Sequence, residues 1–392
     1  MIKLNKKLYE LQREDLFSKV TKRINEFKAS NPNVELISLG IGDVSKPVIK
    51  PVIDAMHKAV DDLADMETFR GYLAYTGHDF LKDKIIAYDY KGLGFTRDEI
   101  YVSCGTKTDS TSILELFDID AKICITNPMY PVYKDGATCL NRKMTELPLD
   151  DKDNYVSDIP KEKFDVMYIC SPSNPIGIAY TYQELKRFVD YANANDCVIL
   201  FDNAYFPFIT SSNVPKTIYE IEGAKNCAIE FRTYSKVASF TGVRCSYYVI
   251  PNDIDKDINI LWKERVINRY NGTDYIAQRG AEATYLEESQ KLIKANIADY
   301  MDNAKILRDA FISLGFEVWG GIDCAFMWIK TINDMDSWDF FDIMLNELNI
   351  IIIPGSIFGS FGKNYFRVSG LGNKEDSLKA IKKLEDYYEK KN

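Results

Sequence analysis

Residues 166–201 read VMYICSPSNPIGIAYTYQELKRFVDYANANDCVILF, and this stretch decides the fold. It begins with an unbroken apolar run, 166–170, and ends with a second apolar run, 197–201. Between the runs, Thr181 and Glu184 have the spacing of a capping box, which predicts the start of a helix. The apolar residues that follow have helical spacing: Leu185, Phe188, Val189 and Ala192. Two strands buried on both faces and joined by a helix predict a right-handed βαβ unit in a mostly parallel sheet.

Polar side chains follow the predicted strands of this sheet. Asn174 comes shortly after the first apolar run, and Asp202 and Tyr205 come directly after the second. A third apolar run, 227–229, leads to Lys236. Ligands of parallel sheets bind at the carboxyl ends of the strands. We therefore expect a carboxylate, an amide, a phenol and a lysine to meet in one crevice.

The stretch that contains the lysine, residues 230–244, reads EFRTYSKVASFTGVR. Burial lowers the pKa of a lysine amine and makes it a nucleophile that forms a Schiff base with an aldehyde. The hydroxyls of Thr233 and Ser235 and the guanidinium of Arg244 suit a phosphate dianion. These are the parts of a pyridoxal phosphate anchor. A lysine after a serine is more often a solvated surface residue, so this interpretation depends on the rest of the chain.

Two further strands are expected upstream, at 100–103 and 122–126, each followed by a turn. The turn at 104–107 includes Thr106 and Lys107 and leads into a helix that we expect to begin near Thr108. A strand, a glycine turn and a helix form a natural phosphate seat. After the second strand, Tyr130 lies between two prolines and could stack on a planar cofactor, although a turn tyrosine on the surface is an equal alternative. The glycines around Gly42 could let the backbone approach a ligand.

Composition excludes several classes of protein. The 392-residue chain has 46% hydrophobic and 27% charged residues and a formal net charge of -9, which argues against a nucleic-acid binder. Its eight cysteines form no Cys-x-x-Cys pair and it has two histidines, so we expect free thiols and no metal site. No apolar run approaches the roughly 20 residues that span a membrane, and no signal peptide is recognisable, so we expect a cytoplasmic protein.

The pattern outside the central part of the chain suggests a second, smaller domain. Helices are expected at 11–29, 51–64, 280–315, 336–349 and 374–390. Short strands are expected at 35–39, 316–319, 326–330 and 350–353. We predict a large domain at 41–272, and a small α+β domain formed by 1–40 together with 273–392.

Nearly the whole chain resembles the fold-type I pyridoxal phosphate enzymes of the aspartate aminotransferase superfamily, and within it the LL-diaminopimelate aminotransferases. The stretches that carry the resemblance are 39–44 (LGIGDV), 69–72 (FRGY), 171–175 (SPSNP), 218–225 (IYEIEGAK) and 240–244 (FTGVR). The resemblance implies an α/β fold with a three-layer αβα large domain, a mostly parallel sheet and a smaller α+β domain. It also implies a homodimer whose active sites are completed across the interface.

The resemblance assigns roles to individual residues. Lys236 matches the Schiff-base lysine, Asp202 the partner of the pyridine nitrogen, and Tyr205 a partner of the ring oxygen. Residues that match cofactor-binding positions are Thr106, Lys107, Tyr130, Asn174, Asp202, Tyr205, Thr233, Ser235, Lys236 and Arg244, with Tyr72 and Asn271 from the neighbouring subunit. Positions expected to contact the substrate are Gly42, Lys107, Tyr130, Asn174, Tyr75, Asp15 and Arg367. Arg367 matches the arginine that binds the α-carboxylate.

The implied function is pyridoxal phosphate-dependent transfer of an amino group between an amino acid and a 2-oxo acid such as 2-oxoglutarate. The donor would be LL-diaminopimelate or another amino acid with a polar or charged side chain, which suggests lysine biosynthesis. Two departures leave the donor open: Tyr75 stands where these enzymes carry a glutamate, and Asp15 stands where they carry a tyrosine. A lyase or decarboxylase of the same fold is the alternative, and a non-catalytic cofactor-sensing module is a third hypothesis.

Overall fold

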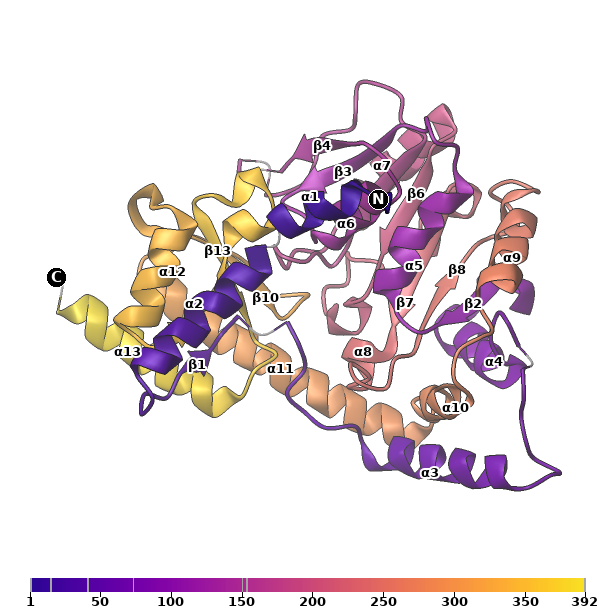
Figure 1. Ribbon diagram of the computed structural model, residues 1–392, viewed down its shortest axis with the longest axis horizontal. Coiled ribbons are helices and arrows are strands. Elements are labelled where there is room, and N and C mark those ends of the chain that lie inside the picture. Colours follow the sequence, from indigo (N-terminus) through magenta and orange to yellow (C-terminus); the bar gives the residue numbers. More distant parts are fainter. Residues whose placement is uncertain are drawn as a thin grey trace.

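The structure is a computed structural model that describes residues 2–14, 16–40, 42–72, 74–149, 151–152 and 154–390. Figure 1 shows two regions of unequal size, joined by a long helix that runs along the base of the molecule. The larger region contains the central sheet. The smaller region combines segments from near the chain's beginning and end, because the indigo helix α2 lies beside the yellow C-terminal helices.

The central sheet has seven strands in the order β2-β8-β7-β6-β5-β3-β4. β8 is antiparallel to both of its neighbours, and the other neighbouring pairs are parallel. The strands span β2 Ile100–Ser103, β3 Ile123–Asn127, β4 Met144–Pro148, β5 Val166–Cys170, β6 Val198–Asp202, β7 Ala228–Thr233 and β8 Ser246–Val249. The mostly parallel sheet predicted from the sequence is confirmed.

The βαβ unit that decided the fold is present at the centre of this sheet. β5 pairs in parallel with β6, with Val166 opposite Val198. The helix between them, α7 Tyr182–Asn195, begins with the predicted capping box, in which Thr181 accepts from the Glu184 amide and Glu184 accepts from the Thr181 amide. The sheet position of β5 and β6 therefore follows from local sequence signals.

Helices cover both faces of the sheet and give three layers. On β6, Ile199 and Phe201 pack into one apolar cluster, and Val198 and Leu200 pack into the cluster on the opposite face. The first cluster includes residues of α3 Lys50–Ala64, α4 Asp79–Tyr88, α7 and α10 Tyr275–Ala283. The second includes residues of α6 Val132–Cys139 and α9 Ile258–Arg269, and α5 Thr106–Ser112 packs against α6.

The smaller region is built around a four-stranded antiparallel sheet in the order β12-β13-β10-β9. Its strands are β9 Val318–Gly320, β10 Phe326–Lys330, β12 Ile353–Pro354 and β13 Tyr365–Ser369. A parallel pair joins β1 Ile37–Ser38 to β11 Ile350–Ile351. The helices of this region are α2 Leu16–Ser30, α11 Glu287–Ser313, α12 Ser337–Asn346 and α13 Lys374–Glu389, whereas α1 Lys7–Glu14 packs against α6 of the larger region. Val20, Ile37 and Leu39 share one core with residues 300–384.

Several element boundaries differ from the sequence expectations. The helix expected at 11–29 corresponds to the end of α1 and to α2, which lie on either side of residue 15, outside the described residues. The helix expected at 280–315 is α10 followed by α11. The helix expected near Thr108 begins at Thr106. The run at 350–353 divides into β11 and β12, which belong to different sheets. α10 packs against α3 and α4, and the domain limits at residues 40 and 272 stay a prediction.

Short 3₁₀ turns complete the described chain: η1 Arg97–Glu99, η2 Ile113–Leu116, η3 Phe206–Phe208, η4 Ile218–Glu220, η5 Ala224–Asn226, η6 Ile332–Asp334, η7 Gly355–Phe358 and η8 Ser360–Gly362. Within the described ranges, no helix is both long and apolar enough to cross a membrane. The cysteines are free thiols, of which Cys104 and Cys139 are exposed.

Candidate functional site

A cavity of about 520 Å³ lies at the carboxyl ends of the parallel strands. Twelve residues that the sequence analysis singled out line it: Gly42, Thr106, Lys107, Tyr130, Asn174, Asp202, Tyr205, Thr233, Ser235, Lys236, Arg244 and Arg367. They come from loops after β2, β3, β5, β6 and β7, and from β13 of the smaller region. Parallel strands end at one edge of the sheet, which explains why residues so distant in sequence meet there.

Lys236 lies in α8 Tyr234–Val237, directly after β7. Its Nζ donates to the carbonyl oxygen of Gly42. Burial lowers the pKa of Lys236 to about 8, with smaller contributions in the same direction from Arg367 and Arg244 and an opposing one from Asp43. A fraction of this amine is therefore unprotonated and nucleophilic at neutral pH.

Asp202 is the last residue of β6 and is 8% exposed. Burial raises its pKa to about 6, against the opposing effect of hydrogen bonds from the Tyr133 hydroxyl and the Ala204 amide. Tyr133 donates to Oδ2 of Asp202. Oδ1 of Asp202 is buried and has no hydrogen-bond partner within the described residues. The carboxylate thus has one oxygen available for a ligand that carries an N–H group.

Ser235 and Arg244 line the cavity close to each other, and Gly105 lies beside Arg244. Nη1 of Arg244 lies 3.4 Å from Oγ of Ser235. A Cβ atom at Gly105 would lie 2.2 Å from Nη2 of Arg244, so any larger residue there would displace the guanidinium from its present position. The hydroxyl of Thr233 is engaged within the chain: it accepts from the Ser235 amide at 3.0 Å and lies 2.9 Å from Oγ of Ser235. Ser235 and Arg244 are left as the donors best placed for an anion.

Arg367 reaches the cavity from the middle of β13 and is 4% exposed. Nη1 donates to Oδ1 of Asn174 at 2.8 Å, and Nη2 donates to the Gly40 carbonyl at 3.1 Å. The guanidinium lies over the ring of Phe326 at 4.4 Å. Burial lowers its pKa to about 10. Its hydrogen bonds are to neutral groups, and Nε has no hydrogen-bond partner within the described part of the chain. A buried cation of this kind requires an anionic ligand.

Comparison with known proteins decides the family. The model of aminotransferase class I and II matches residues 34–384. The chain belongs to this aminotransferase family.

The relatives agree with this assignment. The chain is 41% identical to an LL-diaminopimelate aminotransferase from Methanosphaera stadtmanae, with 98% of each chain covered. It is also 41% identical to an LL-diaminopimelate aminotransferase from Bacteroides thetaiotaomicron, over 99% of this chain and all of that one. Among solved structures, the L,L-diaminopimelate aminotransferase from Chlamydomonas reinhardtii has a TM-score of 0.93 at 32% identity and 99% coverage of both chains. The fold-type I architecture is thereby confirmed, and the chain is an enzyme, a transaminase.

Three predicted site residues of the aminotransferase lie outside the cavity, and Asp15 lies outside the described residues. Tyr72 is 80% exposed and Tyr75 is 38% exposed. Asn271 is also exposed. The loops that carry them are in contact, because a Cβ atom at Gly272 would lie 2.6 Å from the carbonyl oxygen of Ala74. Tyr72 and Asn271 therefore sit on neighbouring loops, away from the cavity of their own chain.

Six residues that line the aminotransferase cavity were not expected from the sequence: Phe17, Tyr133, Cys170, Ala204, Thr241 and Ile353. Tyr133 follows Tyr130 by three residues, and their rings meet edge to face at 5.6 Å. Tyr130 lies in the turn before α6 and Tyr133 in its first turn, so closeness to Tyr130 in the sequence was the available signal. Phe17 of α2 approaches from the N-terminal segment and contacts Phe358, with 6.1 Å between ring centroids. Nothing in the local sequence around residue 17 indicates this contact.

Proposed function

We propose that the enzyme transfers the amino group of an amino acid with a polar or charged side chain to a 2-oxo acid such as 2-oxoglutarate, with pyridoxal phosphate as its cofactor. The observation that carries this proposal is Arg367, a buried guanidinium that lines the same cavity as Lys236 and has no carboxylate partner among the described residues. An α-carboxylate bound there would be held by paired hydrogen bonds. Transaminases of this family act on amino and 2-oxo acids.

Three features of the cavity fit pyridoxal phosphate. Oδ1 of Asp202, free and buried, suits a protonated pyridine nitrogen. Ser235 and Arg244, with the close approach at Gly105, suit the phosphate. Tyr130 lines the cavity and suits the ring face. When bound, the cofactor supplies an aldehyde that carries the amino group and a ring that delocalises negative charge.

The protein's own side chains supply the remaining chemistry. Arg367 and Asn174 would fix the substrate carboxylate and so orient its α-hydrogen. Nζ of Lys236, with its pKa lowered to about 8, would take the proton from the substrate's α-carbon and return it later in the reaction. Asp202 would keep a proton on the ring nitrogen. The Tyr205 hydroxyl would donate to the ring oxygen.

The names of the relatives support LL-diaminopimelate as a donor, and with it a role in lysine biosynthesis. Tyr75 and Asp15 depart from the pattern of these enzymes, so the proposal also includes donors with another polar or charged side chain. We further propose a homodimer in which Tyr72 and Asn271 complete the site of the partner. Their exposure on neighbouring loops supports that arrangement.

The test is a half-reaction screen of the purified protein with pyridoxal phosphate. Each candidate amino acid, LL-diaminopimelate and glutamate included, is added without an oxo acid, and the loss of the cofactor's visible absorbance is followed. We expect loss of absorbance with a matching 2-oxo acid product, and recovery when 2-oxoglutarate is added. Release of ammonia or carbon dioxide would instead favour the lyase or decarboxylase alternative. No absorbance change with any amino acid would refute the proposal.

A further inference from the structure

The turn after β6 brings three residues into the active-site cavity and turns one away from it. Asp202, Ala204 and Tyr205 line the cavity, whereas Asn203, between them, does not. Asn203 is 1% exposed. Its side chain points to the opposite side of the turn, where a second polar cluster is buried. A residue in this position can fix the turn from behind without touching substrate or cofactor.

Asn203 is anchored to β7 and to the loop before η4. Its Nδ2 donates to Oε1 of Glu230 at 2.7 Å and to the carbonyl oxygen of Lys216 at 2.9 Å. Its backbone amide donates to the carbonyl oxygen of Phe231 at 3.0 Å. Oδ1 of Asn203 has no partner within the described residues. The side chain is therefore held through Nδ2, and chiefly by the carboxylate of Glu230.

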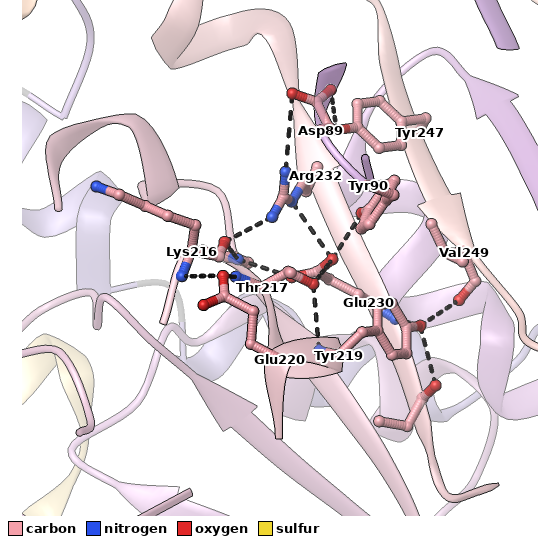
Figure 2. Close-up of polar contacts among 12 residues, drawn as sticks. Asp89, Tyr90, Lys216, Thr217, Tyr219, Glu220, Glu230, Arg232, Tyr247 and Val249 are labelled. Atoms are coloured by element: carbon pink, nitrogen blue, oxygen red, sulfur yellow. Dashed lines mark hydrogen bonds and ion pairs between the residues drawn. The ribbon is translucent and has the colours of Figure 1, made fainter. Parts of the chain in front are cut away.

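Figure 2 shows the hydrogen bonds and the ion pair that hold Glu230. It is fully buried, with 0% exposure. Its Oε2 accepts from the Tyr90 hydroxyl at 2.6 Å and from the Thr217 hydroxyl at 2.9 Å, and lies 3.4 Å from Nε of Arg232. A buried carboxylate with three neutral donors and a cation is well compensated and has little freedom to move.

Arg232 of β7 also contacts the residues that hold Asn203, and it connects them to Phe206 of η3. Its guanidinium lies over the Phe206 ring at 4.0 Å and over the Tyr90 ring at 4.9 Å. Nη2 donates at 2.5 Å to the carbonyl oxygen of Lys216, the same oxygen that accepts from Asn203. Asn203, Glu230 and Arg232 thus form a closed set of contacts behind the turn. Figure 2 shows the part of this set around Glu230 and Arg232.

The position of the turn matters for the carboxylate of Asp202. The backbone amide of Ala204 donates to Asp202 and opposes the rise of its pKa. That amide and the Tyr205 side chain follow Asn203 directly, so release of Asn203 frees both. We propose that Asn203, held by Glu230, is a positioning residue that sets the orientation of Asp202 and Tyr205 toward the cofactor. This proposal rests on the proposed function, because it assumes the cofactor site.

Two matched variants separate positioning from stability. Asn203→Ala removes the Asn203 donor from Glu230, and Tyr90→Phe removes the Tyr90 hydroxyl from the same carboxylate. Each variant deprives Glu230 of one buried hydrogen bond, but only the first releases the turn. The unfolding midpoint of the cofactor-free protein is measured for both. The dissociation constant of pyridoxal phosphate and the pH midpoint of its visible absorbance are then measured in the loaded enzyme, together with kcat and KM.

We expect both variants to lower the unfolding midpoint by comparable amounts. Asn203→Ala should also weaken cofactor binding about 10-fold, shift the absorbance midpoint by about half a pH unit and lower kcat about 10- to 100-fold with little change in KM. Tyr90→Phe should stay within about twofold of the wild type in these readouts. The proposal would be overturned if the two variants had equal effects on cofactor binding, the absorbance midpoint and kcat. It would also be overturned if the Asn203→Ala enzyme had unchanged absorbance and kcat. Turnover by the wild type in the same assay tests the proposed function separately.

Discussion

At the scale of single residues, the site depends on charged groups that the fold has removed from water. Burial lowers the pKa of Lys236 and Arg367 and raises the pKa of Asp202, so it favours the neutral form of each group. The lysine gains nucleophilicity from this shift, and the arginine and the aspartate gain affinity for a ligand of opposite charge. The same burial destabilises the protein when no ligand is bound, and both consequences can be measured.

Replacement of Arg367 by lysine tests the carboxylate site. Lysine keeps the positive charge but loses the two parallel donors, so kcat/KM for an α-amino acid should fall about 100-fold. The matched control is a substrate: an amine of the same side chain that lacks the α-carboxylate should react equally slowly with wild type and variant. An Arg367→Lys enzyme with wild-type kcat/KM would place the carboxylate elsewhere.

Replacement of Asp202 by asparagine should stabilise the cofactor-free protein while it impairs activity. The pKa of Asp202 is about 6 in the folded chain and near 4 when unfolded. The folded state therefore holds the proton more tightly, and the stability associated with it is lost as pH rises from about 4 to 6. At pH 7 the variant should be more stable by about 2 kcal/mol, and near pH 4 the two proteins should match. Urea unfolding at both pH values checks this, and a difference that grows as pH falls would contradict it.

At the scale of elements, the helix between β5 and β6 shows what local sequence can determine. Thr181→Ala removes the side-chain acceptor for the Glu184 amide and should lower the free energy of unfolding by about 1 kcal/mol. Thr181→Ser keeps the acceptor and should have little effect. Both variants should retain wild-type kcat/KM, because α7 contributes no residue to the cavity. Urea unfolding with steady-state kinetics decides this, and a loss of activity without a loss of stability would refute the assignment.

The sequence predicted the elements whose signals lie within a few neighbouring residues, and it did not predict features that depend on contacts in the tertiary structure. β5, α7 and β6 carry their signals within a few residues: apolar runs, helical spacing and a capping box. β7 was expected from its apolar start alone, but it continues to Thr233 through Glu230 and Arg232. Charged residues inside a buried strand are possible only because they pair with each other and with Asn203, contacts that form in the tertiary structure.

Site residues follow the same division. Lys236, Asp202 and Asn174 were predicted because each follows a strand in a parallel sheet, where ligand-binding residues gather. Tyr133 was missed because its role comes from a hydrogen bond to Asp202, a residue far along the chain. The break between α10 and α11 was also missed. Thr284 ends α10 by donating its hydroxyl to the Ala281 carbonyl at 2.6 Å, and Tyr285 next to it donates to Asp89, a contact in the tertiary structure.

At the scale of the whole molecule, the cavity depends on contact between the two regions. Arg367 comes from the small antiparallel sheet, and its partner Asn174 follows β5 of the central sheet. α11 links the regions. It contacts α3 of the larger region, and further along the helix Tyr300, Leu307 and Phe311 pack into the core of the smaller region. If the domains are divided as predicted at residues 40 and 272, their relative movement would carry Arg367 toward or away from Lys236. Substrate carboxylate would then favour the closed arrangement.

The proposed dimer gives the sharpest test at this scale. If Tyr72 serves the partner's site, Lys236→Ala damages the site of its own chain, whereas Tyr72→Ala damages the site of the partner chain. A mixed dimer of the two variants has one site with both changes and one site with neither. Random mixing makes about half of the dimers mixed, so activity should return to about one quarter of the wild-type value per site, although each variant alone has little. The control is a mixture of Asn203→Ala with Lys236→Ala. Each of these changes damages the site of the chain that carries it, so both sites of a mixed dimer are damaged and no intact site can form. No recovery with Tyr72→Ala would show that each chain builds its site alone, and recovery in the control would show that the regained activity does not report on Tyr72.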